Sequence, residues 1–259
     1  WYSGVPTMHQ TILLRAHRNL EIAKGLKLRL IRSSSASLPP AVFNDLNDVF
    51  SCPVIEAYGM TEATHQMTSN PLPPKQQKAG FVGLPAGPEV CIMNENGEVL
   101  KQGDEGEVCI KGENVTLGYD NNEEANKTSF TNGWFRTGDQ GYFDKEGYLK
   151  ISGRLKEIIN KGGEKISPLE VDNVLMDHPF IDQAVCFGYD DKMLGENIAS
   201  AIIIKSGETC SENDVLQYAQ EKLAKFKIPK KIFFVEEIPK GATGKLQRNV
   251  LAKKFGLNN

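Results

Sequence analysis

The sequence predicts an α/β region followed by a smaller α+β domain, and three observations support this prediction. Near the start, segments with apolar residues at helical spacing alternate with short apolar runs typical of buried strands. Between residues 80 and 149, short strand-like runs are separated by glycine and Asn-Gly turns, which favours an antiparallel β subdomain. After Gly153, helices and strands alternate again over ~100 residues, an ordinary size for a small domain. We therefore expect two domains, residues 1–153 and 154–259.

The first region is expected to place loops directly after buried strands. Apolar spacing predicts two helices, the second of which follows a double proline. Two short apolar runs predict strands, one leading into the serine-rich segment Ser33–Ser37 and the other into a turn at Gly59. The expected helices cover residues 8–17 and 41–50, and the expected strands cover residues 28–31 and 54–58.

Turn and cap signals place the remaining elements. Asn96-Gly97 and Asn132-Gly133 favour two-residue hairpins in the β subdomain. Ser167 is expected at the N-cap of a helix that runs to about residue 176, with Pro168 in its first turn. A second helix should begin at Ser211, because residues 211–214 are close to a capping box. The strands expected in the small domain cover residues 183–188, 199–205 and 232–235.

Composition excludes several classes of protein. The chain has 259 residues and a net charge of -3, so it presents no basic field for nucleic acid. The longest apolar stretches, such as Ala199–Ile204, are far too short to span a bilayer. The five cysteines are scattered without a Cys-x-x-Cys pair, which argues against a zinc site and favours a reducing compartment, the cytoplasm.

Lys245 is the most informative single residue. It lies in a glycine-flanked segment without acidic neighbours, as expected of a lysine that is delivered to an anionic site. The segment is not a Walker phosphate loop, because Pro239 stands where that motif has its first glycine. Three distant segments carry groups that such a site needs: residues 58–62, 134–139 and 153–156.

Residues in the first two of these segments suit a nucleotide. Asp139 follows Gly138 at an expected strand end, and its ionised carboxylate can accept from both ribose hydroxyls. Glu62 can hold Mg²⁺ through one carboxylate, while Thr61 can bind a phosphate and Tyr58 can stack on adenine. The alternatives are a plain surface turn for Thr-Gly-Asp, and a strand ending before a capped helix for residues 58–62.

Other candidates are less specific. Arg154 can reach ribose or phosphate oxygens, or it can be an exposed charge on a linker. Residues 161–165 form a glycine-rich loop beside a helix start, where backbone N–H groups can approach an anion. His9 and His65 are the polar residues best suited to touch an organic acid, although a lone histidine is more often structural.

Together and in this order, these segments resemble the adenylate-forming superfamily of acyl-CoA synthetases, luciferases and peptide-synthetase adenylation domains. The resemblance implies ATP or AMP, CoA and Mg²⁺ as ligands, and a two-step reaction through an acyl adenylate. It implies a hinge at Lys156, about which the small domain swings to remove Lys245 and present a CoA-guiding loop. The implied catalytic residues are Lys245, Thr61 and Glu62, with Glu62 on the metal; the implied nucleotide contacts are Tyr58, Gly59, Thr61, Asp139, Arg154 and Lys245; the implied CoA residues are Lys161, Gly162, Gly163 and Glu164.

Within the superfamily, the chain is most similar to oxalate–CoA ligases through residues 31–38, 56–71 and 159–168. A two-carbon dianion needs a small polar pocket, and His9, Ser35 and His65 can donate to its distal carboxylate. The alternatives are a medium-chain fatty acid or 4-coumarate-type CoA ligase, an amino-acid adenylation domain, and a nucleotide-binding or interaction fragment without catalysis.

One part of the family pattern is missing. The Ser/Thr/Gly-rich phosphate loop of the superfamily does not occur in these 259 residues. We therefore expect the chain to be the C-terminal portion of a longer synthetase, and we expect it to be inactive when isolated.

Overall fold

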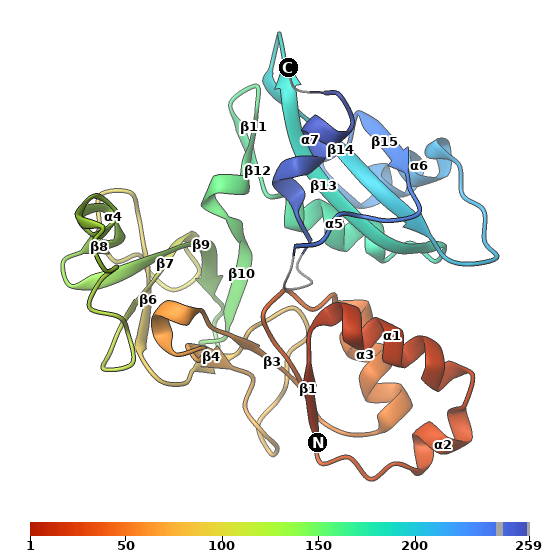
Figure 1. The fold of residues 1–259 in the computed structure, drawn as a ribbon, viewed down its shortest axis with the longest axis horizontal. Coiled ribbons are helices and arrows are strands. Elements are labelled where there is room, and N and C mark those ends of the chain that lie inside the picture. The colour runs from red at the N-terminus through yellow and green to blue at the C-terminus, as the bar shows by residue number, and fades with distance from the viewer. Residues whose placement is uncertain (242–245, 258–259) are drawn as a thin grey trace. The chain divides into compact units, whose positions relative to one another are not determined.

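The computed structural model describes residues 1–241 and 246–257, and its contacts divide the chain into two compact units, residues 1–151 and 152–259 (Figure 1). The division falls inside strand β10 (Leu149–Arg154), two residues before the boundary expected from the sequence. The expected classes of structure follow one another, an α/β region with an antiparallel β subdomain and then an α+β unit. In the part of the chain that the structure describes, every helix is too short or too polar to cross a bilayer.

The first unit begins with a five-stranded sheet in the order β1-β2-β3-β4-β5. The first three strands are parallel and the last two pair antiparallel. The strand expected at residues 28–31 lies later in the chain, because Ile31 is the first residue to pair with both Tyr2 and Val54. The strands are β1 (Tyr2–Gly4), β2 (Ile31–Ser33), β3 (Val54–Tyr58), β4 (Thr68–Ser69) and β5 (Leu84–Pro85).

Three helices accompany this sheet: α1 (Pro6–His17), α2 (Leu20–Gly25) and α3 (Pro40–Phe50). The first and third begin slightly earlier than expected, because each starts with a proline, whose missing N–H has no helical partner at that position anyway. Helix α2 has no counterpart among the expected helices. Apolar residues of the helices and strands share one core, formed in part by Leu13, Ile31, Phe43, Leu46 and Val54.

The β subdomain is a second sheet in the order β10-β9-β7-β6, with β8 paired to β9. The expected hairpin at Asn132-Gly133 is confirmed: the two residues have φ of 52° and 80°, the left-handed pair that a type I′ turn requires. The bounds are β6 (Glu89–Met93), β7 (Gly106–Lys111), α4 (Glu123–Ser129), β8 (Phe130–Thr131) and β9 (Trp134–Phe143).

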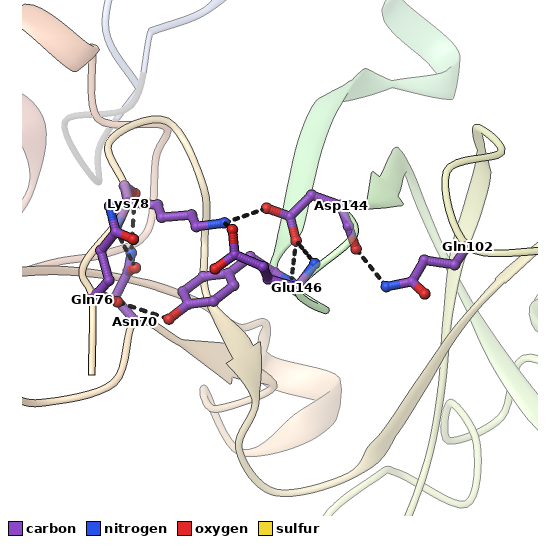
Figure 2. Close-up of polar contacts among 7 residues, drawn as sticks. Asn70, Gln76, Lys78, Gln102, Asp144 and Glu146 are labelled. Atoms are coloured by element: carbon purple, nitrogen blue, oxygen red, sulfur yellow. Dashed lines mark hydrogen bonds and ion pairs between the residues drawn. The ribbon is translucent and has the colours of Figure 1, made fainter. Parts of the chain in front are cut away.

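Lys78 connects the segment after β4 to the turn between β9 and β10 (Figure 2). Its Nζ lies 2.6 Å from Asp144 Oδ2 and 2.9 Å from Glu146 Oε1. The same ammonium stands 4.4 Å from the centre of the Tyr148 ring, and the Tyr148 hydroxyl donates to the Gln76 carbonyl at 2.8 Å. These contacts hold the β subdomain against the loops of the first sheet, within one compact unit.

The second unit is built around β14, which pairs antiparallel with β13 and β11 and parallel with β15. Helices α5 and α6 pack their apolar residues into its core. The bounds are β11 (Ile159–Lys161), β12 (Glu164–Ile166), α5 (Pro168–Met176), β13 (Ile181–Asp191), β14 (Gly195–Ile204), α6 (Glu212–Lys222), β15 (Lys231–Phe234) and α7 (Leu251–Lys254), with 3₁₀ turns at Leu155–Glu157, Lys225–Lys227 and Arg248–Val250.

Of the two expected helix caps, only the one at Ser211 is made by its side chain. Ser211 and Asp214 form the expected capping box, with Asp214 N donating to Ser211 Oγ at 3.2 Å and Ser211 N donating to Asp214 Oδ2 at 2.9 Å. Ser167 occupies the N-cap position of α5, but its hydroxyl donates to the Ser152 carbonyl instead of capping the helix. A Cβ at Gly153 would lie 2.9 Å from that hydroxyl, so the contact depends on glycine.

Candidate functional site

Tyr58 and Asp139 come together across 81 residues of sequence. The Tyr58 hydroxyl donates to Asp139 Oδ2 at 2.5 Å, which joins the end of β3 to the middle of β9. Asp139 is only 4% exposed, so the alternative of a plain surface turn is wrong. A short hydrogen bond to an ionised acceptor fixes the orientation of both side chains. The pair thus places a carboxylate beside an aromatic ring at the end of a parallel strand.

Asp139 was expected at a strand end, but it lies in a bulge inside β9. The register between β7 and β9 shifts at Glu107, and Gly138 has a left-handed φ of 72°. Glu107 accepts from Gly138 N at 2.9 Å and from Arg136 Nε at 2.7 Å, which holds the bulge in place. Bulges redirect side chains next to functional sites, and this one aims Asp139 at Tyr58.

The loop after β3 is held by a close approach of its two ends. Gly59 lies against the backbone of His65, where an added Cβ would be 2.3 Å from the His65 carbonyl oxygen. Thr64 and His65 both have left-handed φ, 51° and 62°, and His65 N donates to Met60 O at 2.9 Å. This geometry leaves the Thr61 and His65 side chains exposed on one short loop.

Glu62, the expected metal ligand, is partly oriented already. It lies in the 3₁₀ turn Thr61–Ala63, and its Oε1 accepts from the Tyr119 hydroxyl at 2.9 Å. Among the described residues, no hydrogen bond reaches Oε2, so that oxygen is available to a cation. No group of three or more His, Cys, Asp and Glu in the described ranges can hold a metal by itself. The residues therefore fit a Mg²⁺ ion whose remaining ligands are phosphates and water.

Three buried polar side chains, those of His9, Ser33 and Glu56, lie at the parallel strands β1, β2 and β3. Gly4, Ser33 and Glu56 are lateral neighbours across β1, β2 and β3, so they share one face of the sheet. His9 packs on Gly4, where a Cβ would be 3.1 Å from its ring. His9 Nε2, Ser33 Oγ and Glu56 Oε2 are all buried without a hydrogen-bond partner among the described residues. Burial lowers the pKa of His9, so its neutral form is favoured.

Glu56 also supports the serine-rich segment. Its Oε1 accepts from the backbone N–H of Leu38 at 2.8 Å. Burial raises the pKa of Glu56 from 4.5 to about 8, although the hydrogen bond from Leu38 acts in the opposite direction. Burial therefore favours the protonated carboxyl group at neutral pH in the folded chain.

The Glu56→Gln variant is expected to lose a pH dependence of stability. The unfolded chain releases the Glu56 proton near its ordinary pKa of 4.5, while the folded chain keeps it to about 8. The free energy of unfolding should therefore fall as pH rises through this window, and glutamine should remove that fall while still accepting from Leu38 N. Urea denaturation across the window measures it, with the exposed Glu21→Gln as control. Parallel curves for wild type and Glu56→Gln would contradict the assignment.

The three expected acid-binding residues come from the segments that follow β1, β2 and β3. His9 is fully buried, whereas Ser35 and His65 are exposed and both adopt left-handed backbone conformations. Arg32 connects their segments: its guanidinium donates to Ser34 Oγ at 2.9 Å and to Gln66 Oε1 at 3.3 Å.

The other expected residues belong to the second unit or lie outside the described ranges. Arg154 and Lys156 are exposed at the end of β10 and in the turn that follows it. Lys245, expected to be the adenylation lysine, falls in residues 242–245, outside the part of the chain that the structure describes.

The glycine-rich loop expected at residues 161–165 is instead a tight hairpin between β11 and β12. Gly162 and Gly163 form its turn with φ of 60° and 91°, which glycine adopts without steric cost. Gly162 N donates to Leu194 O at 2.8 Å, so this N–H is already paired and cannot approach an anion. Lys161 and Glu164 are therefore strand residues that face each other across the hairpin.

Lys161 also borders a cleft of about 680 Å³ within the second unit. Burial lowers the pKa of Lys161, and the charge of Lys230 acts in the same direction. Amines beside apolar surface suit a ligand that carries both phosphate groups and a hydrophobic portion. The lining includes Lys161, Lys225 and Lys230 together with Leu194, Leu223 and Ile228.

Sequence reasoning missed Glu56, Arg32 and Tyr119. Glu56 carries a readable signal, because it interrupts the otherwise apolar strand Val54–Tyr58. Tyr119 carries none, because its partner Glu62 lies 57 residues away and only the fold brings them together.

An α/β region, a β subdomain and a following α+β unit are also the architecture of solved adenylate-forming enzymes. The ATP-bound structure of MatB from Rhodopseudomonas palustris superposes with a TM-score of 0.90 at 33% identity, over 98% of this chain and 50% of that one. MenE from Bacillus subtilis, in complex with ATP and magnesium ion, gives 0.82 at 34% identity, over 95% and 50%.

Sequence comparison also leads to adenylate-forming enzymes. Residues 1–120 match the AMP-binding enzyme family, and residues 170–245 match the AMP-binding enzyme C-terminal domain. The chain belongs to this family of AMP-binding, adenylate-forming enzymes, which confirms the resemblance seen in the sequence.

Two curated relatives are named oxalate–CoA ligase. The protein from Arabidopsis thaliana is 52% identical over 256 residues, which cover 98% of this chain and 50% of the relative. The protein from Saccharomyces cerevisiae is 51% identical over 257 residues, covering 98% and 47%. The chain thus spans about half the length of the curated relatives it matches.

Proposed function

We propose that the protein containing this chain is an ATP-dependent acid–CoA ligase that acts on a small dicarboxylic acid, oxalate in the first place. The observation that carries the proposal is the hydrogen bond between Tyr58 and Asp139, at 2.5 Å. It unites two nucleotide-binding segments of the family, 81 residues apart, at the end of a parallel strand. Open α/β sheets bind their ligands at that end of the strands.

In the first half-reaction, the acid carboxylate attacks the α-phosphorus of ATP, pyrophosphate leaves, and an acyl adenylate forms. Asp139 accepts from the ribose hydroxyls, and Tyr58 holds that carboxylate while its ring covers adenine. Thr61 donates to a phosphate, and Glu62 would hold the Mg²⁺ that offsets phosphate charge. Lys245 bridges the two anions that must approach each other, and Arg154 contacts the ribose.

In the second half-reaction, the CoA thiol attacks the acyl adenylate and AMP leaves. The small domain turns about Lys156 between the two steps and withdraws Lys245. The cleft beside the β11–β12 hairpin supports a CoA role for this region, because Lys161, Lys225 and Lys230 offer charge to phosphates next to apolar walls.

Oxalate is favoured by the names of the two relatives and by the polar residues in the segments that follow β1, β2 and β3. Ser35 and His65 are exposed there, and His9 Nε2 has no partner among the described residues. These groups suit a second carboxylate, whereas a fatty acyl or coumaroyl chain needs apolar walls. The 259-residue chain alone is expected to be inactive, since the family's phosphate loop is not in its sequence.

The test is CoA-thiol consumption by the full-length protein with ATP and Mg²⁺, across oxalate, malonate, octanoate and 4-coumarate. Oxalate should be preferred over octanoate and 4-coumarate by about 100-fold or more in kcat/KM, because a site that hydrogen-bonds a second carboxylate rejects a substrate without one. His65→Ala should then reduce oxalate turnover, with the exposed His17→Ala as matched control. A preference for octanoate or 4-coumarate would contradict the assignment of oxalate as substrate. Absence of turnover with every acid would contradict the ligase assignment.

A further inference from the structure

Arg248 is a buried arginine that binds three separate segments of the second unit. Its Nε donates to Glu157 Oε2 at 3.0 Å, and its Nη2 donates to Asp172 Oδ2 at 2.7 Å. Its Nη1 donates to Asp172 Oδ1 at 3.3 Å and also to the Cys186 carbonyl. The side chain is only 15% exposed, so the charge is held almost wholly by these partners.

The Asp172 end of this network is buried. Asp172 lies in α5 with a side chain 5% exposed, and it also accepts from Cys186 N at 2.5 Å. Arg248 and Asp172 together thus lock α5 to β13. A buried ion pair of this kind adds little net stability over an apolar pair, because desolvation offsets the attraction. The position of Arg248, three residues after Lys245, suggests a role beyond stability.

Arg248 follows closely after the segment that carries Lys245. Lys240 and Leu246 form an antiparallel bridge, and Gln247 N donates to Pro239 O at 3.0 Å. These contacts join the residues that stand on either side of 242–245, directly before Arg248. The guanidinium therefore anchors the end of the lysine segment to the body of the second unit.

The third partner lies beside the hinge. Glu157 is in the 3₁₀ turn Leu155–Glu157 and directly follows Lys156. Its side chain is 37% exposed, so it contributes little to the core. The Arg248 guanidinium thus connects Glu157, the residue after the proposed hinge, with the chain that follows Lys245. The connection is a charge-assisted hydrogen bond, which has a defined direction.

We propose that Arg248 is a positioning residue for adenylation, and that its bond to Glu157 fixes the chain that directly follows Lys245, residues 246–248, relative to the proposed hinge. This inference rests on the proposed function, in which Lys245 acts in the first half-reaction only. Removing the charge of Glu157, which weakens the bond, should then impair adenylation, while the thioester step, from which Lys245 is withdrawn, should proceed normally. A merely structural role would affect both steps equally.

The experiment uses the full-length protein and Glu157→Gln, which keeps the size of the side chain and removes its charge. Adenylation is measured as pyrophosphate–ATP exchange with oxalate, and the thioester step as CoA consumption from preformed oxalyl adenylate. We expect kcat for exchange to fall about tenfold, the thioester rate to stay within about twofold, and KM for ATP to be unchanged, as for an interaction used only in the transition state. Glu170→Gln, which breaks the 2.6 Å pair with Lys227 in the same unit, is the matched control and should change neither step.

A double variant tests the route through the lysine. In a Lys245→Ala background, which itself should lose exchange and keep the thioester step, Glu157→Gln should have no further effect on residual exchange. Arg248→Lys, which keeps the charge but loses the planar fork, should lower exchange in the same selective way; if it fails to fold, the Glu157 variants still decide.

Normal exchange in Glu157→Gln, or an equal loss in both half-reactions, would overturn the role of Arg248 while leaving the ligase assignment intact. Absence of exchange in the wild-type protein with every acid would instead overturn the proposed function, so the two failures are distinguishable.

Discussion

Replacing Asp139 by alanine is expected to lower kcat/KM for ATP by about 100-fold or more. The variant removes an ionised acceptor for two ribose hydroxyls, and hydrogen bonds to charged groups contribute about 1.5–3 kcal/mol each. It also leaves the Tyr58 hydroxyl without the carboxylate to which it donates at 2.5 Å. Steady-state kinetics in ATP and calorimetric binding of AMP to the full-length protein measure the loss.

Two further variants sharpen this test. Asp139→Asn keeps an acceptor for Tyr58 and one for ribose, so its loss should lie between those of wild type and Asp139→Ala. Asp104→Ala removes an exposed carboxylate of the same β subdomain and should leave ATP kinetics unchanged. An Asp139→Ala protein with wild-type affinity for AMP would remove this residue from the nucleotide site.

Gly59→Ala is expected to lower both stability and activity severely. The added Cβ would lie 2.3 Å from the His65 carbonyl oxygen, 2.4 Å from its carbon and 2.8 Å from Gln66 N. All three are backbone atoms, so no side chain can move aside and the loop that carries Thr61 and Glu62 must shift. Overpacking of this kind costs about 1–3 kcal/mol, and we expect the upper end of that range.

Thermal unfolding and the pyrophosphate exchange rate measure the two effects of Gly59→Ala. Gly25→Ala at the end of α2 is the matched control, because a Cβ there meets nothing within 4 Å. Alanine at that position should be neutral or slightly stabilising, since it restricts the unfolded chain. If Gly59→Ala melts and reacts as Gly25→Ala does, the close approach of the loop ends is not needed for function.

Local signals were sufficient wherever a few neighbouring residues decide the structure. The strand at residues 54–58, the hairpin at Asn132-Gly133 and the capping box at Ser211 and Asp214 all occur as expected. Each depends on periodicity, on glycine at positive φ, or on a hydrogen bond between residues three apart, and all of these can be read from sequence.

Expectations were wrong where the pairing of strands decides the structure. β2 begins at Ile31 because its partners on both sides fix the register. The glycine-rich loop became a turn because Ile159–Lys161 pairs with Glu164–Ile166. Asp139 lies in a bulge because Glu107, on the neighbouring strand, accepts from Gly138 N.

The sequence by itself determined the family, the order of the two domains and the residue types proposed for the nucleotide site, because these are carried by short motifs in fixed order. Only the tertiary structure decided that Tyr58 binds Asp139 and that Tyr119 orients Glu62. It also decided that burial raises the pKa of Glu56, which accepts from Leu38 N, and that Arg248 binds Glu157. Each of these depends on burial and on contacts between residues more than 15 positions apart. The pKa of a side chain and the direction in which it points are set by those neighbours in space.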